Sequence, residues 1–151
     1  MNEQTSVEPS NPAAPAVPNI KRFLVKDDWK DYQVTLEVNL DRLTVERAEM
    51  INGFWTDAED RKDEESGDVI RTVIRLAGQE VIGEMLENRG AHFTPTCNRY
   101  PAQSATMKLH SGEGWGGESE GDDYGWCGIR VIGADVQPPN FEELSLTEIS
   151  Q

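Results

Sequence analysis

The sequence has no long apolar run, little cysteine and histidine, and few basic residues. Hydrophobic residues make up 36% of the chain. No uncharged apolar stretch approaches the ~20 residues that a bilayer-spanning helix needs, so we exclude a transmembrane protein. The composition also excludes collagen-like, coiled-coil and disulfide-scaffold classes. The low apolar share predicts a globular protein with a modest core.

Cysteine and histidine are too few and too widely spaced for the usual metal and nucleophile patterns. They occur only at Cys97, Cys127, His92 and His110, without the paired spacing of a zinc site. No known nucleophile signature surrounds either cysteine. The first ten residues lack the apolar stretch of a secretory signal, so we expect a reducing, cytoplasmic setting with both thiols free. We predict no metal and no cofactor.

Positive charge is scarce. The 151 residues include 28 Asp and Glu but only 14 Lys and Arg, which gives a net charge of −14. Residues 57–68 hold seven acids and two bases, and residues 109–151 hold nine acids and one base. The negative electrostatic field of such an acidic surface repels phosphate. We therefore expect neither direct nucleic-acid binding nor a membrane partner. This field attracts basic proteins, among which nucleic-acid-handling proteins are one class.

The length favours one domain between two tails. Residues 1–19 hold four of the eight prolines and show no amphipathic period, which predicts a disordered tail. Residues 20–137 are expected to form a single α+β domain. Residues 138–151 are expected to form an acidic C-terminal tail.

The first folded segment reads as a β-hairpin. Residues 20–26 form a short apolar run, and residues 32–40 alternate apolar and polar side chains over the whole stretch. A period of two over nine residues is typical of a half-buried strand. The two strands, joined by a turn at residues 27–30, are predicted to pair with each other.

Two helices are expected to follow the hairpin. Thr44 is a suitable N-cap for a helix over residues 45–55, and the acidic stretch after it either extends this helix or loops out. The apolar stripe of this first helix is expected to comprise Val45, Ala48, Met50, Ile51, Phe54 and Trp55.

The second helix is the longest predicted element. Asp68 is the expected N-cap and Gly90 the expected C′ residue of about six helical turns. Gly78 and Gly83 inside it either cost ~1 kcal/mol each relative to alanine or permit close packing on the sheet.

The second half of the chain gives weaker patterns. Residues 91–103 are interpreted as an irregular crossing, residues 105–110 as a short strand, residues 112–121 as a glycine-rich loop and residues 124–132 as the last strand. The predicted order is therefore β-β-α-α-(β)-β. This order indicates a two-layer α+β fold, with an antiparallel sheet of three to four strands covered on one face by two helices.

Three runs carry a resemblance to a known family: DWKDYQVTLEVNLDRLTVERAEMINGFWTDAEDR, GDVIRTVIRLAG and HSGEGWGGESEGDDYGWCGIRVIGADV. The chain resembles, over residues 21–136, a family of short acidic hypothetical proteins of bacteria and their phages and plasmids, classed as a domain of unknown function. The resemblance implies a bacterial or mobile-element origin and a cytoplasmic accessory role. The family supplies no catalytic motif, so no residue gains a role from it.

Our leading hypothesis is a non-enzymatic accessory protein that binds a basic protein partner through two acidic patches, with Trp115 as an apolar anchor. The first acidic patch comprises Asp57, Glu59, Asp60, Asp63, Glu64 and Glu65. The second acidic patch comprises Glu113, Trp115, Glu118, Glu120, Asp122 and Asp123. Two alternatives stay open: a small metal-dependent hydrolase that uses the glycine-rich acidic loop, and a structural subunit that oligomerises.

Overall fold

The computed structural model describes residues 17–96, 99–118 and 122–150. The predictions for the first sixteen residues, for Cys97 and for Glu120 therefore lie outside the described residues. The described elements, in chain order, are β1 (Ile20–Lys26), β2 (Gln33–Asn39), α1 (Val45–Gly53), α2 (Ala58–Glu64), α3 (Val69–Glu87), β3 (Ala91–Phe93), α4 (Arg99–Ser111), β4 (Ile129–Val136) and a 3₁₀ turn (Phe141–Glu143).

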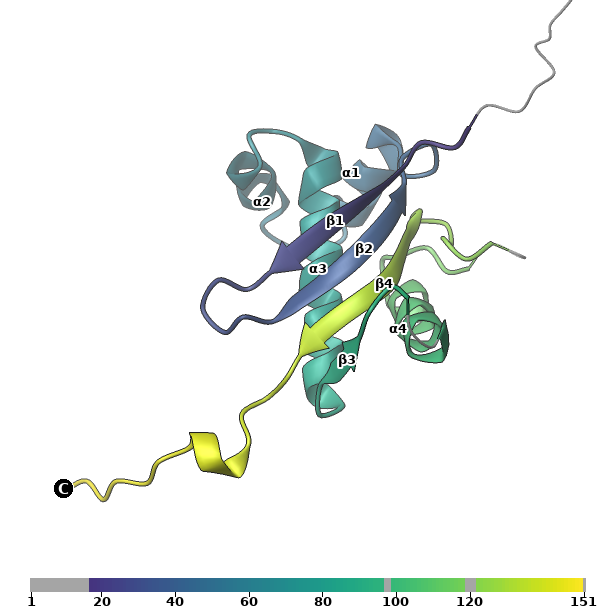
Figure 1. Ribbon diagram of the computed structural model, residues 1–151. Helices are drawn as coiled ribbons and strands as arrows, with labels where there is room; N and C mark the ends of the chain where they lie inside the picture. The colour runs from purple at the N-terminus through teal and green to yellow at the C-terminus, as the bar shows by residue number, and fades with distance from the viewer. Residues whose placement is uncertain (1–16, 97–98, 119–121, 151) are drawn as a thin grey trace, which may run out of the picture.

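The strands form one antiparallel sheet in the order β1-β2-β4-β3. In Figure 1 this sheet lies in front, α3 runs behind it, α1 and α2 lie near the upper end of α3, and α4 lies beside β4. Val34, Leu36 and Val38 of β2 are completely buried, because alternate side chains of a strand point to the same face. The predicted α+β fold is confirmed, with four strands and four α-helices among the described residues.

The predicted hairpin is also confirmed. β1 and β2 pair from Ile20 opposite Asn39 to Lys26 opposite Gln33. Asp27 closes the connection, because its carboxylate accepts the backbone N–H groups of Trp29 at 2.7 Å and Lys30 at 3.0 Å. The first strand has the predicted bounds, and the second is one residue shorter at each end than predicted.

The long helix α3 begins where the sequence predicts. The Asp68 carboxylate accepts the N–H of Arg71 at 3.1 Å, as an N-cap does. At the other end the prediction was wrong by one residue. Arg89 takes the left-handed C′ position, and Gly90 follows it with its N–H donating to the Met85 carbonyl at 2.6 Å. This pair of residues forms a Schellman motif.

Helix α1 is shorter than predicted, and its apolar stripe points elsewhere. Thr44 caps it as expected, but the helix ends at Gly53, and a turn separates it from α2. Ala48 and Ile51 are buried, whereas Val45, Met50 and Phe54 are exposed. The prediction that all these residues form one core stripe was therefore wrong. The helical period of 3.6 places Met50 and Phe54, four residues apart, away from the core.

The segment between α3 and the glycine-rich loop was predicted incorrectly. The expected crossing contains strand β3 and the start of α4, and the expected strand over residues 105–110 is part of α4. The Thr106 hydroxyl accepts the Val131 N–H at 2.9 Å, and the His110 Nε2 lies 2.7 Å from the Ile129 carbonyl. These side chains from α4 therefore satisfy part of the β4 edge that β3 does not reach.

The last strand begins later than predicted, at Ile129 instead of Tyr124. Gly125 and Gly128 have φ angles of +67° and +82°, which belong to turns and not to strands. Cys127 is buried among these turns, and burial raises the pKa of its thiol to about 11. The thiol is therefore protonated at neutral pH.

Candidate partner-binding surface

The first acidic patch lies on α2 and its two flanks, and two of its six acids bind cations of α3. Arg75 contacts Glu64 and Glu65, each at 2.9 Å, and Arg71 contacts Glu65 at 3.2 Å. The hydrogen bond from Arg75 lowers the pKa of Glu65, burial opposes it, and the bond from Arg71 adds to the lowering. Glu64 and Glu65 thus hold α2 against α3. The other members of the patch, Asp57, Glu59, Asp60 and Asp63, are exposed.

Two basic side chains hold α2 against α1. The Arg61 guanidinium donates to the Asn52 side-chain oxygen and backbone carbonyl, both at 2.9 Å, and to the Thr56 carbonyl at 2.6 Å. Lys62 forms an ion pair with Glu49 at 2.9 Å. The acidic stretch is therefore neither an extension of α1 nor a loop. It is a separate short helix whose inner face is basic and whose outer face is acidic.

The second acidic patch is also divided between internal and exposed acids. Asp122 forms an ion pair with Arg42 and accepts the Tyr124 N–H at 2.7 Å. Asp123 lies 3.7 Å from Arg130. Glu113 and Glu118 are exposed and make no ion pair within the part of the chain that the structure describes. Glu120 lies outside that part.

Trp115 is a core residue, so the prediction that it is an exposed anchor was wrong. Its side chain is 0% exposed, and its ring packs against Trp55 with the centroids 5.6 Å apart. Its indole N–H is buried without a hydrogen-bond acceptor among the described residues. Bulky aromatic side chains contribute most to cores when they are completely enclosed. The tryptophan of the glycine-rich loop therefore lies in the core.

The loop packs directly on the end of α1. Gly114 has a φ of +89°, and a Cβ atom there would lie only 2.8 Å from ring atoms of Phe54 and Trp55. Glu113 precedes Gly114 in the chain, and Asp57 lies two residues after Trp55. This contact therefore brings one end of each acidic segment toward the end of α1.

Two apolar side chains are exposed at this end of α1. Met50 of α1 is 66% exposed, and Phe54, the C-cap residue that follows α1, is 53% exposed. Six exposed acids of α1, of α2 and its flank, and of the glycine-rich loop make no ion pair among the described residues: Glu46, Asp57, Glu59, Asp60, Asp63 and Glu113. We call this surface the acidic corner: Glu46, Met50, Phe54, Asp57, Glu59, Asp60, Asp63 and Glu113. The four-residue spacing of Met50 and Phe54, set apart from Ala48 and Ile51, is the sequence signal that could have revealed it.

A charged cluster also lies on the face of the sheet opposite the helices. Glu37 of β2 is 7% exposed and accepts from Arg130 at 2.6 and 2.8 Å, from Tyr124 at 2.8 Å and from Arg22 at 3.1 Å. Burial alone would raise the pKa of Glu37, but the bonds from Arg130, Tyr124 and Arg22 outweigh it and lower that pKa. Burial and the Glu37 carboxylate raise the pKa of Tyr124. The cluster ties three strands and a loop together.

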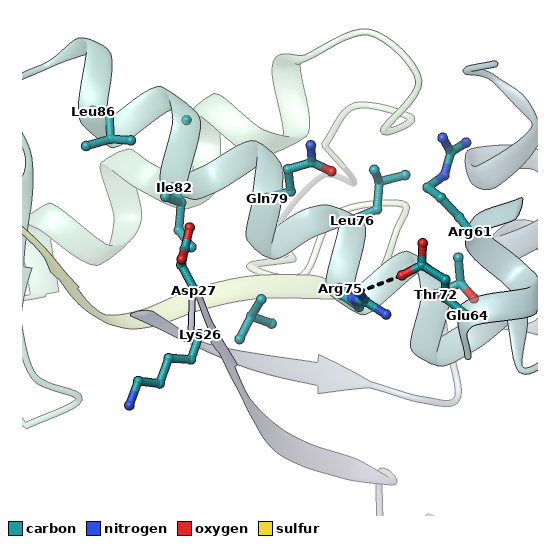
Figure 2. A pocket seen from close by; sticks show the side chains of 12 residues that line it. Lys26, Asp27, Arg61, Glu64, Thr72, Arg75, Leu76, Gln79, Ile82 and Leu86 are labelled. Atoms are coloured by element: carbon teal, nitrogen blue, oxygen red, sulfur yellow. Dashed lines mark hydrogen bonds and ion pairs between the residues drawn. The ribbon is translucent and has the colours of Figure 1, made fainter. Parts of the chain in front are cut away.

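A groove of about 450 Å³ runs between α3, α2 and the end of β1. Figure 2 shows Leu76, Ile82 and Leu86 along its α3 side, with Lys26 opposite and Arg75 bound to Glu64 at one end. Among the residues that the structure describes, no three His, Cys, Asp or Glu side chains gather closely enough to hold a metal ion. Within the same ranges, no helix is long and apolar enough to cross a membrane.

The fold and the composition define a small, strongly acidic α+β protein. The chain belongs to the DUF2528 family of proteins of unknown function, whose family model matches residues 33–146. The resemblance predicted from the sequence is thereby confirmed.

The similar curated proteins come from a phage and a prophage. The chain is 33% identical over 64 residues to protein ea10 of Escherichia phage lambda and to the lambda prophage-derived protein ea10 of Escherichia coli O6:H1. The match covers 42% of this chain and 51% of each relative, so the chain spans about half the length of the curated relatives it matches. No solved structure matches the chain.

Proposed function

We propose that this protein is a non-enzymatic accessory protein that binds a basic protein partner at the acidic corner. The observation that carries the proposal is the exposure of Met50 and Phe54, together with exposed acids that form no ion pair among the described residues. Protein interfaces commonly combine a small apolar centre with a charged rim. A basic partner would neutralise the rim and cover the two apolar side chains in the same step.

The contact surface in this proposal is narrower than the two sequence-predicted patches. Glu64, Glu65, Asp122 and Asp123 already bind arginines of this chain, and Trp115 is in the core. These acids still contribute to the long-range field that steers a basic partner. Direct contact would come from the acids that are exposed and unpaired, together with Met50 and Phe54.

The partner class we favour is a protein that handles nucleic acid. The cleft of such a protein is basic because it must neutralise a dense row of phosphates. A set of carboxylates held on a short helix and a tight loop can compete for that cleft through the same electrostatic attraction. The similar proteins named above belong to a phage and a prophage, a setting in which phage and host nucleic-acid-handling proteins meet.

The test is a pull-down from a bacterial lysate with immobilised full-length protein, read by mass spectrometry. The corner variant Asp63→Lys/Glu113→Lys reverses one exposed acid in each acidic segment. The matched control Glu80→Lys/Glu87→Lys makes the same charge change on exposed positions of α3, away from the corner. Met50→Ser removes an apolar side chain without changing the charge.

We expect the wild-type protein and the α3 control to retain the same basic protein at low salt. The corner variant is expected to lose it, and Met50→Ser is expected to bind at least tenfold more weakly. Equal retention by the corner variant and the control would show that the corner is not the contact surface. Retention of no basic protein by the wild type would refute the proposal itself.

A further inference from the structure

The C-terminal segment carries exposed apolar side chains that nothing in the fold covers. After β4 it leads away from the body of the molecule (Figure 1). Phe141, Leu144, Leu146 and Ile149 are all exposed, Leu146 to 99%. Within the segment, only the 3₁₀ turn at Phe141 is fixed locally, by reciprocal bonds between Asn140 and Glu143. Such a density of exposed apolar side chains marks a surface that is covered by another surface.

β1 forms an edge of the sheet, and its outer backbone groups face away from β2. The N–H of Asp27 donates to Tyr32 at 2.7 Å, and Asn19 accepts the N–H of Leu40 at 2.8 Å, so these residues face β2. Antiparallel pairing alternates, so Arg22, Leu24 and Lys26 direct their N–H and C=O groups outward. No described strand pairs with this edge.

A hollow lies on the helix side of this edge. It has a volume of about 240 Å³, and its apolar lining includes Phe23, Val25 and Ile74. Lys26, Arg71 and Arg75 lie at its rim, together with Glu65, which pairs with both arginines. Val25, Lys26 and Arg75 also line the larger groove of Figure 2, so the hollow lies next to the groove along β1 and α3. A strand added beside β1 would point every second side chain into this space.

The charges of the edge and of the C-terminal segment are opposite. β1 carries Lys21, Arg22 and Lys26 and no acid, although the chain as a whole is strongly acidic. Arg22 binds Glu37 and Lys26 lies 3.7 Å from Asp31, so Lys21 is the basic residue of β1 without an ion pair among the described residues. Residues 137–150 carry Glu142, Glu143 and Glu148 and no base. Residues 144–147 read Leu-Ser-Leu-Thr, an alternation that suits a strand with one apolar face.

We propose that residues 144–149 of one copy add as an outer strand to β1 of a second copy. Leu144 and Leu146 would enter the hollow, and the glutamates of the segment would lie near the basic side chains of β1. Main-chain hydrogen bonds along the edge would supply affinity, as in other cases of strand addition. Because every chain carries both the segment and the edge, the exchange is reciprocal and closes into a two-fold symmetric dimer.

A second copy is the occupant that the geometry favours. In Figure 1 the segment starts at the end of β4 and leads away from its own body, and β2 lies between β4 and β1 in the sheet. The basic residues of β1 disfavour direct pairing of two β1 strands, because like charges would then face each other. An acidic strand from another copy meets the edge without that repulsion.

The test is the mass of the full-length protein in solution, measured by sedimentation velocity at tens of micromolar. We expect a dimer for the wild type. The variant Leu144→Asp/Leu146→Asp changes only exposed positions, so it should fold normally while its dimer dissociation constant rises at least tenfold. Met107→Asp alters an exposed apolar residue of α4 and should leave the dimer intact.

A charge exchange tests the edge itself. Lys21→Glu/Lys26→Glu and Glu142→Lys/Glu148→Lys should each dimerise at least tenfold more weakly than the wild type. Mixing the two variants should restore association, since the altered edge of one then meets the altered segment of the other. A monomeric wild type, or a dimer that the leucine substitutions leave unchanged, would overturn the inference. Neither result bears on the acidic corner, which uses other residues.

Discussion

At the residue scale, Glu37 shows how this acidic protein uses a carboxylate inside its fold. It lies between Arg22 and Arg130 in the register of three neighbouring strands, so cross-strand pairing alone brings the three together. The Tyr124 hydroxyl adds a fourth group from the loop before β4. The cluster is therefore a structural device that joins distant parts of the sequence, and its acid is not available to a partner.

Replacing this acid gives a prediction with a defined pH dependence. Glu37→Gln should lower the free energy of unfolding by about 2 kcal/mol at pH 7, because the arginines lose a charged acceptor. The folded-state pKa of Glu37 is lowered below its unfolded value of about 4.3, so its contribution is complete above that pH. It is lost as the pH falls through the folded-state pKa.

Denaturant unfolding of both proteins at a series of pH values measures this contribution. The difference between wild type and Glu37→Gln should shrink toward zero as the pH drops below about 4.3. Glu80→Gln, an exposed change on α3, should stay within about 0.5 kcal/mol of the wild type at every pH. A Glu37→Gln difference that persists unchanged into acid would mean that the charge of Glu37 is not what stabilises the cluster.

Trp115 gives a second prediction at this scale. Trp115→Ala should cost about 4 kcal/mol of unfolding free energy, because it empties a completely enclosed site beside Trp55. Trp29→Ala, an exposed tryptophan in the hairpin turn, should cost less than about 0.5 kcal/mol. Thermal or denaturant unfolding separates the two. Equal small losses of unfolding free energy in the two variants would contradict the burial of Trp115.

At the element scale, two glycines of α3 have opposite roles. A Cβ atom on Gly78 would lie 2.6 Å from the Cβ of Val25, whereas one on Gly83 would meet nothing within 4 Å. The sequence left open whether each glycine costs helix stability or permits close packing on the sheet. The structure gives a different answer at each position. Gly78 permits the close approach of α3 to β1, and Gly83 is a helix glycine with no packing reason.

The two alanine substitutions should therefore change stability in opposite directions. Gly83→Ala should raise the free energy of unfolding by about 1 kcal/mol through helix propensity. Gly78→Ala should lower it by about 2 kcal/mol, because the added methyl group forces α3 away from the sheet. Chemical denaturation measures both variants. Each serves as the control for the other, because both replace a glycine of α3 with alanine. A stabilising Gly78→Ala would mean that α3 and β1 are not in close contact.

The elements that the sequence predicted well are those with a strong local signal. The alternation in β2 and the long apolar period of α3 identified both elements, and Thr44 and Asp68 marked two helix starts. Helix α4 was missed because its inward face mixes apolar and polar residues. Ala105 and Leu109 pack on the core, but Thr106 and His110 bond the edge of β4, so the apolar stripe is too sparse for its periodicity to be detected.

The candidate surface was only partly predictable for a similar reason. The acidic segments are visible in the sequence, but the arginines that occupy Glu64, Glu65 and Asp122 come from other elements. The exposure of Phe54 and the burial of Trp115 depend on the packing of the glycine loop against α1, which is a long-range contact. Local patterns carry no information on such contacts, so the sequence did not reveal which aromatic residue is exposed.

At the scale of the whole molecule, the net charge of −14 divides into acids with two different roles. Some acids bind basic side chains of the chain itself and hold α2, the glycine loop and the sheet in place. Others stay exposed at the acidic corner and produce the field that a partner would meet. The proposed binding uses the exposed acids of the acidic corner. Only the contribution of these acids to partner binding should weaken strongly as the salt concentration rises.

The most direct measurement is the affinity of the captured basic partner for the full-length protein as salt rises from about 50 to about 200 mM. We predict that the affinity falls steeply for the wild type and for Glu80→Lys/Glu87→Lys. Asp63→Lys/Glu113→Lys should bind more weakly at every salt concentration and show a smaller dependence on salt. An affinity that neither salt nor the corner substitutions change would contradict the acidic corner as the site of binding.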